Sequence, residues 1–168
     1  MLDMQTSQNL IHKETTHVNK IVIALMIAVV AAGPAVASEE TEVMAAVNQF
    51  MDGFNNGDIK MLRSACADEV SIIDEFSPYE WHGAGACAKW SSDYDADAKK
   101  NGITEGHVTL SKPSHIDVVG DRAYVVGPAN YAYKEKGKSV KEVGSVFTIA
   151  LQKSTSGWRI IGWAWAKH

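Results

Sequence analysis

The sequence contains no block of basic residues. Its 16 Lys and Arg are outnumbered by 20 Asp and Glu, which gives a formal net charge of −4. Nucleic-acid-binding proteins need a positive patch against the phosphates, so nucleic acid is not an expected partner. The sequence also lacks a Gly-rich phosphate loop, a nucleophile elbow and zinc-ligand spacing. We therefore expect neither a metal nor a cofactor.

The sequence also lacks an apolar run long enough to cross a membrane. The run Ile21 to Ala32 has 12 residues and is followed by Gly33-Pro34, whereas a membrane helix needs about 20. A basic flank, a short apolar core and an Ala-x-Ala site before Ser38 are typical of a secretory signal. The sequence predicts a signal peptide over 1–37 and one mature domain over 38–168. We expect that domain to be periplasmic or secreted, and free of the membrane after cleavage.

Cysteine is scarce, with only Cys66 and Cys87. In an exported protein an even number of cysteines favours a disulfide, so this pair is a disulfide candidate. The alternative is that both are buried as small hydrophobic side chains. Neither has a second ligand at the spacing that zinc sites require.

The periodicity of apolar residues predicts helices followed by strands. A helix is expected over 39–56, a shorter one capped by Asp58, a strand over 70–74 and a third helix over 84–100. Four long strands are then expected as an antiparallel meander, over 104–119, 122–134, 139–153 and 157–167. Pro and Gly within these segments indicate bulges and bends. The expected class is α+β, with three helices packed on a strongly curved, mainly antiparallel sheet.

The order of these elements and several short motifs resemble the nuclear transport factor 2-like superfamily, which includes SnoaL-like cyclases and ketosteroid isomerases. The motifs that carry this resemblance are Phe54-Asn55-Asn56-Gly57-Asp58, Ala67-Asp68-Glu69-Val70 leading to Ile72-Ile73-Asp74, Trp81-His82-Gly83, and Gly157-Trp158-Arg159-Ile160. The resemblance implies a cone-shaped α+β fold with an apolar cavity between helices and sheet. It also implies a homodimer formed through the sheet.

The same resemblance places a catalytic base at Asp74, where the first strand ends. Steroid-isomerase-type members add a tyrosine and a second acid as oxyanion donors, but Phe50 and Phe147-Thr148 stand at those positions here. Loss of one such donor typically costs about 10²–10³ in rate. Steroid-type isomerisation is therefore not the expected activity.

Two titratable residues are the candidate catalytic groups. Asp74 would act as a general base if burial raised its pKa, and His82 would be its acid/base partner. The alternatives are that Asp74 and Glu75 end a strand at a solvated loop, and that His82 caps a helix or faces solvent.

Nine aromatic side chains are the candidate walls of a cavity, and about half of them are expected to touch it. Two of the nine are Tyr133 and Trp165. The other seven are the expected ligand-binding residues, Phe50, Phe54, Trp81, Trp90, Tyr94, Tyr131 and Trp163. The first hypothesis is a domain that binds a small apolar or aromatic molecule. The second is a cofactor-independent isomerase, lyase or cyclase, and the third is a non-catalytic dimeric interaction domain whose cavity is filled by its own Trp residues.

Overall fold

The computed structural model describes residues 33–168, with side chains described from Glu39 onward. Most of the predicted signal peptide, residues 1–32, lies outside the described residues. Residues 36–168 form one unit. Its helices and strands are α1 (Gly33–Asn55), α2 (Ile59–Ala65), β1 (Cys66–Ile73), β2 (Glu80–Ala84), α3 (Ala86–Asn101), β3 (Ile103–Leu110), β4 (His115–Val119), β5 (Arg122–Glu135), β6 (Lys138–Ser154) and β7 (Gly157–Ala166).

The boundaries of α2 and α3 are determined by a side-chain cap and by a left-handed glycine. Asp58 is the N-cap of α2, since its Oδ1 accepts a 2.9 Å hydrogen bond from the backbone N–H of Met61. Gly102 ends α3 with a φ of 70°, a left-handed conformation that glycine adopts without a Cβ clash. Both boundaries agree with the predicted second and third helices.

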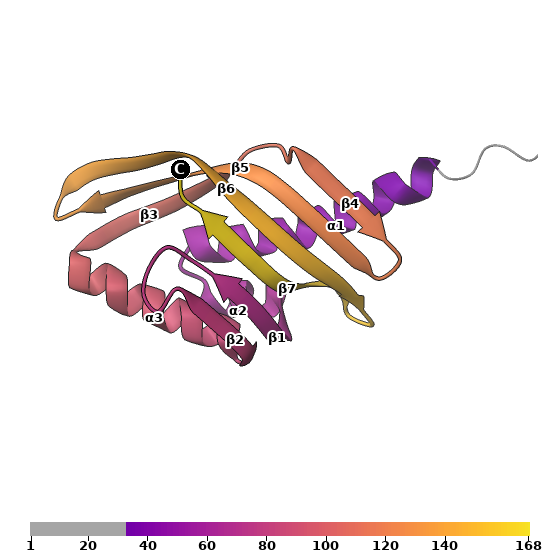
Figure 1. Ribbon diagram of the computed structural model, residues 1–168, viewed down its shortest axis with the longest axis horizontal. Coiled ribbons are helices and arrows are strands. Elements are labelled where there is room, and N and C mark those ends of the chain that lie inside the picture. Colours follow the sequence, from indigo (N-terminus) through magenta and orange to yellow (C-terminus); the bar gives the residue numbers. More distant parts are fainter. Residues whose placement is uncertain (1–32) are drawn as a thin grey trace, which may run out of the picture. The chain divides into compact units, whose positions relative to one another are not determined.

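The seven strands form a single mixed sheet in the order β2-β1-β7-β6-β5-β3, with β4 also pairing with β5. Only β1 and β7 run parallel, and the other pairs are antiparallel. Register shifts interrupt four of the pairings, between β1 and β7, β3 and β5, β5 and β6, and β6 and β7. Such bulges bend strands and increase their twist, which accounts for the curved sheet in Figure 1.

The core lies between the helices and one face of this sheet. In Figure 1, α1 passes behind the long strands. Its Phe50 ring lies 6.4 Å from that of Phe147 in β6 and 5.9 Å from that of Trp163 in β7. Helix α3 packs against β1, β2 and β3. The alternating burial along β5 and β6 shows that these strands turn one face to the core.

Two predicted elements were wrong. The expected strand 104–119 is interrupted at residues 111–114, so β3 and β4 are separate strands that both pair with β5. His107 and His115 therefore do not share a strand. The order of the predicted antiparallel meander is confirmed, because β3 and β4 both pair with β5, β5 pairs with β6, and β6 pairs with β7. Residues 80–84 form β2 rather than a turn and helix start, because they pair with β1.

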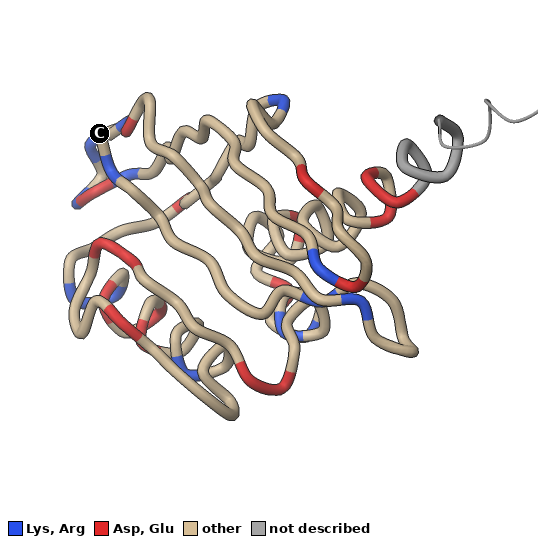
Figure 2. The backbone as a smooth tube through the Cα atoms, turned by 45° about the vertical axis from the view of Figure 1, so that its right-hand side comes forward, with Lys and Arg blue, Asp and Glu red and all other residues tan. Residues whose placement is uncertain are grey.

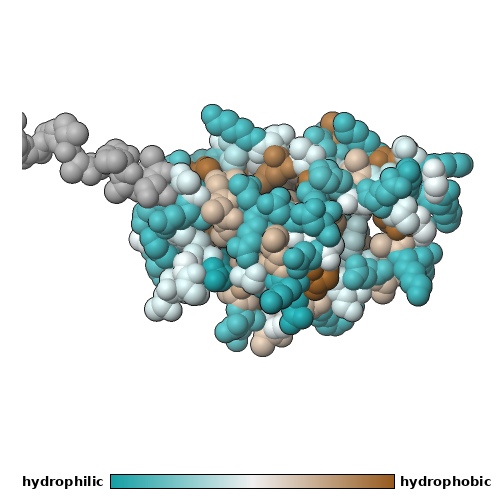
Figure 3. All heavy atoms as spheres, turned by 180° about the vertical axis from the view of Figure 1, so that it is seen from behind, coloured by the Kyte–Doolittle hydropathy of each residue, from teal (hydrophilic) through white to brown (hydrophobic). Residues whose placement is uncertain are grey.

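The described part of the chain has a largely polar exterior on the side seen from behind. Figure 3 shows hydrophilic residues over most of that side, with hydrophobic ones in small separate patches. Within residues 33–168, no helix is both long and apolar enough to cross a membrane.

Candidate functional site

A cavity of about 240 Å³ lies between α1, α3 and the sheet, and we call it the aromatic cavity. All four phenylalanines of the protein line it, together with three tryptophans and three tyrosines. These ten side chains are Phe50, Phe54, Phe76, Trp90, Tyr94, Tyr131, Tyr133, Phe147, Trp163 and Trp165. Their rings pack against one another, as in the edge-to-face contact of Trp90 and Trp163 at 4.9 Å.

Regular spacing in the sequence brings most of these rings to one place. Residues four apart in a helix, and two apart in a strand, lie on the same side of the element. The helical pairs are Phe50 with Phe54 in α1 and Trp90 with Tyr94 in α3, and the strand pairs are Tyr131 with Tyr133 in β5 and Trp163 with Trp165 in β7. Four elements thus each contribute two rings to the aromatic cavity.

Asp74 lies directly after β1 and lines the aromatic cavity. Its Oδ2 accepts a 2.8 Å hydrogen bond from the indole N–H of Trp90, and its Oδ1 accepts one of 2.7 Å from the backbone N–H of Glu75. Burial raises the pKa of the Asp74 carboxyl above 3.8, the two hydrogen bonds oppose this, and the charge of Glu142 adds to it. A carboxyl group with a raised pKa in a cavity is suited to accept and release a proton.

A pair of tyrosine hydroxyls belongs to the same cavity. Tyr94 from α3 and Tyr131 from β5 hydrogen-bond to each other through their hydroxyl groups. Burial raises the pKa of both, so each keeps its proton at neutral pH. Gly106 in β3 leaves room for them, because a Cβ at this position would lie 2.8 Å from the Tyr131 oxygen and 2.9 Å from that of Tyr94. One hydroxyl donates to the other, so one O–H of the pair remains to donate to a ligand oxygen.

A charged group at the C-terminal end of the chain also lines the cavity. Lys167 Nζ lies 2.6 Å from Glu142 Oε1 and 2.9 Å from Glu75 Oε2, and the Tyr133 hydroxyl donates to Glu142 Oε1 at 3.3 Å. We call these four residues the Lys167 cluster. Burial raises the pKa of Glu75, while the hydrogen bond to Glu142 raises that of Lys167. Figure 2 shows basic and acidic segments side by side around this end of the chain.

Most of the predicted site residues lie in the aromatic cavity. Asp74 and six of the seven expected ligand-binding residues line it, and Trp81 does not. Trp81 is buried beside the cavity, where it packs against Phe76 and donates a 2.8 Å hydrogen bond to Asp93 Oδ2. Of the nine candidate aromatics eight line the cavity, which is more than the half expected.

His82 lies outside the aromatic cavity, and its side chain is 55% exposed. Its ring nitrogens lie 3.3 Å from Ser71 Oγ and 3.3 Å from Glu80 Oε2. The reason is strand alternation, because Trp81 points into the core and its neighbour in β2 must point out. The structure therefore does not bring His82 to Asp74 as an acid/base partner.

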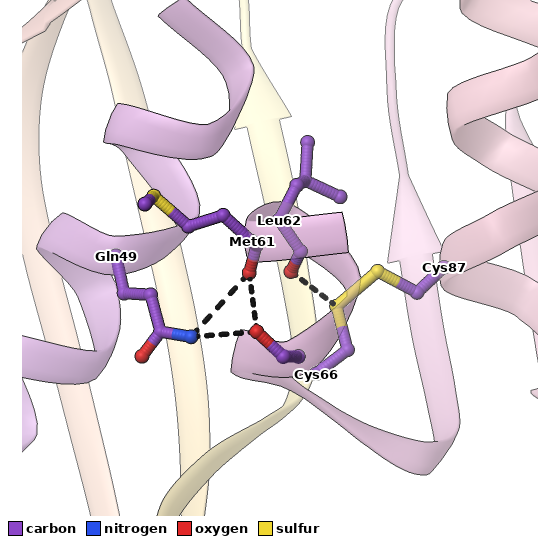
Figure 4. The surroundings of a disulfide bond; sticks show 6 residues. Gln49, Met61, Leu62, Cys66 and Cys87 are labelled. Carbon is purple, nitrogen blue, oxygen red and sulfur yellow. Dashed lines mark hydrogen bonds between the residues drawn. A yellow bond between two sulfur atoms is a disulfide. The ribbon is translucent and has the colours of Figure 1, made fainter. Parts of the chain in front are cut away.

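Cys66 and Cys87 are joined by a disulfide, with their Cα atoms 6.6 Å apart (Figure 4). The bond connects the start of β1 to the first turn of α3. Nearby, Gln49 of α1 donates a 2.8 Å hydrogen bond to Ser64 Oγ of α2. The disulfide holds α3, which carries Trp90 and Tyr94, against the strand that leads to Asp74.

Sequence reasoning missed the Lys167 cluster as part of the site. Glu142 follows the charged segment 134–141, which resembles a solvated hairpin tip, and Lys167 is the penultimate residue. One signal was available, since an acidic residue stands among the apolar residues of a long predicted strand. Phe147 also lines the cavity and was not among the nine candidate aromatics. Among the described residues, no group of three or more His, Cys, Asp or Glu is placed to hold a metal ion.

The sequence matches the SnoaL-like domain family over residues 43–164. The match includes most of α1, all of α2 and α3, and nearly the whole sheet, so it covers most of the cavity lining. The chain belongs to the SnoaL-like family. This membership agrees with the nuclear transport factor 2-like resemblance of the sequence. No curated protein matches this SnoaL-like chain.

Solved structures similar to this SnoaL-like domain share its fold at low sequence identity. A nuclear transport factor 2-like superfamily protein from Salmonella enterica is 13% identical with a TM-score of 0.66, over 79% of this chain and 92% of that chain. A ketosteroid isomerase-like protein from Erwinia carotovora is 16% identical with a TM-score of 0.60, over 76% and 94%. The likeness confirms the predicted cone-shaped α+β fold.

Proposed function

We propose that this SnoaL-like domain binds a small aromatic molecule in the aromatic cavity. The supporting observation is a cavity whose walls are ten aromatic rings, with polar groups at Asp74, at the tyrosine pair and at the Lys167 cluster. At about 30 Å³ per water molecule, its volume equals that of about eight waters, which favours a ligand of one or two rings. A cavity of this size also argues against the interaction-domain hypothesis, in which Trp side chains fill the interior.

Binding is tested by titrating one-ring and two-ring aromatic compounds while following tryptophan fluorescence, with native mass spectrometry of protein purified from its own host. Val108 lines the cavity, so Val108→Phe should fill part of it and weaken binding. Val119→Phe is the matched control, because Val119 is 69% exposed on β4. Equal affinity in the wild type and Val108→Phe would contradict the proposal.

A second candidate function is proton transfer, with Asp74 as general base. Asp74 would take a proton from a carbon next to a carbonyl group. The electron pair of the broken C–H bond would form a C=C bond as the π pair of the carbonyl moves to its oxygen. The free O–H of the Tyr94–Tyr131 pair would stabilise that oxygen by a hydrogen bond, and the pair lies on different elements than those the sequence comparison considered. Asp74 and the hydroxyl pair line the same cavity, which supports this candidate.

Proton transfer is measured as deuterium exchange next to the carbonyl of a one-ring aryl ketone, followed by NMR in heavy water. Asp74→Asn should slow the exchange by about 10² or more, the usual contribution of a general base. Glu80→Gln, which removes an exposed acid beside His82, should leave it unchanged. Absence of exchange in the wild type would leave binding as the function.

We also propose a homodimer formed through the outer face of the sheet. The residues of β5 and β6 that point away from the helices include Tyr124, Val126, Val146 and Thr148, and Tyr124 and Val146 are 45% and 38% exposed. Light scattering should give twice the chain mass, and Thr148→Arg should give a monomer. Ser139→Arg, at the hairpin tip, is the control, and a monomeric wild type would contradict the proposal.

Export is proposed for the same chain, and the disulfide supports it because disulfides persist in oxidising compartments. The proposed cleavage before Ser38 would fall within α1, which begins at Gly33. N-terminal sequencing of the protein from its own host should begin at Ser38. A sequence that begins near Met1 would contradict export by cleavage.

A further inference from the structure

We infer that the ligand of the aromatic cavity is a cation, a small aromatic amine whose ammonium group binds Glu142. This inference rests on the proposed binding function and adds the charge of the ligand to it. Three features of the described residues lead to it: the balance of charges in the lining, one unpartnered carboxylate oxygen, and the aromatic walls.

The charges that line the cavity are mostly negative. Asp74, Glu75, Asp97 and Glu142 line it, and Lys167 is the only basic residue among the lining residues. Lys167 contacts two of the four acids, Glu75 and Glu142. Among the described residues, the Asp74 carboxylate accepts hydrogen bonds from the N–H groups of Trp90 and Glu75, and neither carries a positive charge. An anionic ligand would meet repulsion here, whereas a cation would relieve it.

Glu142 supplies an acceptor that the described residues leave unused. Its side chain is only 9% exposed, and its Oε1 already accepts from Lys167 and Tyr133. Its Oε2 is buried and has no hydrogen-bond partner among residues 39–168. A buried carboxylate oxygen without a donor is unfavourable. Because this oxygen is shielded from solvent, the Glu142 carboxylate would have to turn toward the cavity for a ligand N–H group to reach it, and a ligand that brings this group then gains the interaction. An ammonium group brings both the donor and the positive charge.

The walls favour the same ligand. A cation within about 6 Å of an aromatic face is attracted by the ring's negative face, and more strongly where water is excluded. The aromatic part of the ligand would pack against the rings of α1, α3 and β7. The ammonium of Lys167 lies between Glu75 and Glu142, so the acids at this end of the cavity already bind one cationic group.

Lys167 is also the feature that limits the affinity for a cation. Its side chain is 51% exposed and approaches from the C-terminal end of the chain. A ligand ammonium on Glu142 Oε2 would lie near it and be repelled. Lys167→Met should therefore tighten amine binding while leaving a neutral ligand almost unaffected.

The test compares three one-ring probes by calorimetry on the disulfide-bonded protein at pH 7. The probes are 2-phenylethylammonium, neutral 2-phenylethanol and anionic 3-phenylpropanoate. We expect the amine to bind about tenfold tighter than the alcohol, the scale of one hydrogen bond to a charged group, and the acid to bind weakest. Glu142→Gln should remove the preference for the amine, whereas Glu80→Gln, an exposed acid outside the cavity, should keep it.

The outcomes separate the two proposals. If the alcohol binds as tightly as the amine, the inference of a cationic ligand is overturned and the binding function stands. If none of the three probes binds, the inference is overturned, and the titration with two-ring compounds decides the binding function separately. Circular dichroism checks that Glu142→Gln is folded, and the comparison of the three probes on the wild type decides the inference even if that variant does not fold.

Discussion

The indole N–H of Trp90 donates a 2.8 Å hydrogen bond to Asp74 Oδ2 and thereby links α3 to the end of β1. The two residues are 16 positions apart, and both belong to the aromatic cavity. The disulfide joins the same two elements, with Cys87 three residues before Trp90 and Cys66 eight residues before Asp74. The candidate base is therefore positioned by contacts on both elements that flank it.

Removal of the indole donor should change the proton affinity of Asp74. The Trp90 hydrogen bond lowers the pKa of Asp74 against the larger effect of burial, so Trp90→Phe should raise that pKa further. Carboxyl-carbon NMR over a pH titration measures it. Trp158→Phe is the control, because Trp158 is buried outside the cavity and its indole N–H has no partner among the described residues. An unchanged Asp74 pKa in Trp90→Phe would show that the hydrogen bond is not formed.

Asp74 should also make folding stability depend on pH. Its pKa is raised above the ordinary 3.8, so the folded chain binds this proton more tightly than the unfolded chain. The contribution of Asp74 to the free energy of unfolding is thus fully present at low pH and is lost as pH rises from about 3.8 through the folded pKa. Asp74→Asn cannot titrate, so its stability relative to the wild type should improve over that interval. Urea denaturation at a series of pH values tests this. The prediction is wrong if the difference in free energy of unfolding between Asp74→Asn and the wild type stays constant with pH.

Gly106 should not tolerate even a methyl side chain. Gly106→Ala would place a Cβ 2.8 Å and 2.9 Å from the hydroxyl oxygens of Tyr131 and Tyr94 and push the pair apart. We expect a loss of about 1–3 kcal/mol in the free energy of unfolding, typical of overpacking in a filled interior. The double variant Gly106→Ala with Tyr131→Phe should recover part of it, since one of the crowded oxygens is gone. Equal stability of Gly106→Ala and the wild type would mean that the hydroxyls are not where the structure places them.

Reduction of the disulfide should destabilise the domain and loosen the start of α3. A bond that closes a loop with a separation of 21 residues stabilises by about 3 kcal/mol on the loop-entropy account. Urea denaturation with and without dithiothreitol measures the loss, and ligand affinity should fall with it because α3 carries Trp90 and Tyr94. A Cys66→Ala and Cys87→Ala double variant is the control, and its stability should not respond to the reductant. If the stability of the wild type is the same with and without dithiothreitol, the disulfide is not formed.

Several features of the fold were predictable from sequence because they depend on neighbouring residues. The cap at Asp58 and the end of α3 at Gly102 follow from local backbone chemistry. The convergence of Phe50 with Phe54 and of Trp163 with Trp165 follows from the periods of helix and strand. The position of Asp74 at the end of a buried strand was predictable for the same reason.

Other features depend on which distant segments pack together, and no local pattern determines that. The pairing of residues 80–84 with β1 turns Trp81 inward and His82 outward, which removes His82 from the site. The hydrogen bond between Tyr94 and Tyr131 joins residues 37 positions apart, and Lys167 reaches Glu142 across 25.

The sequence by itself thus determined the α+β class, the three helices and the aromatic character of a cavity, because hydrophobic periodicity acts over a few residues. Only the tertiary structure decided the polar groups of that cavity. Its tyrosine pair and the Lys167 cluster form where the register of the sheet and the packing of α3 bring remote side chains together.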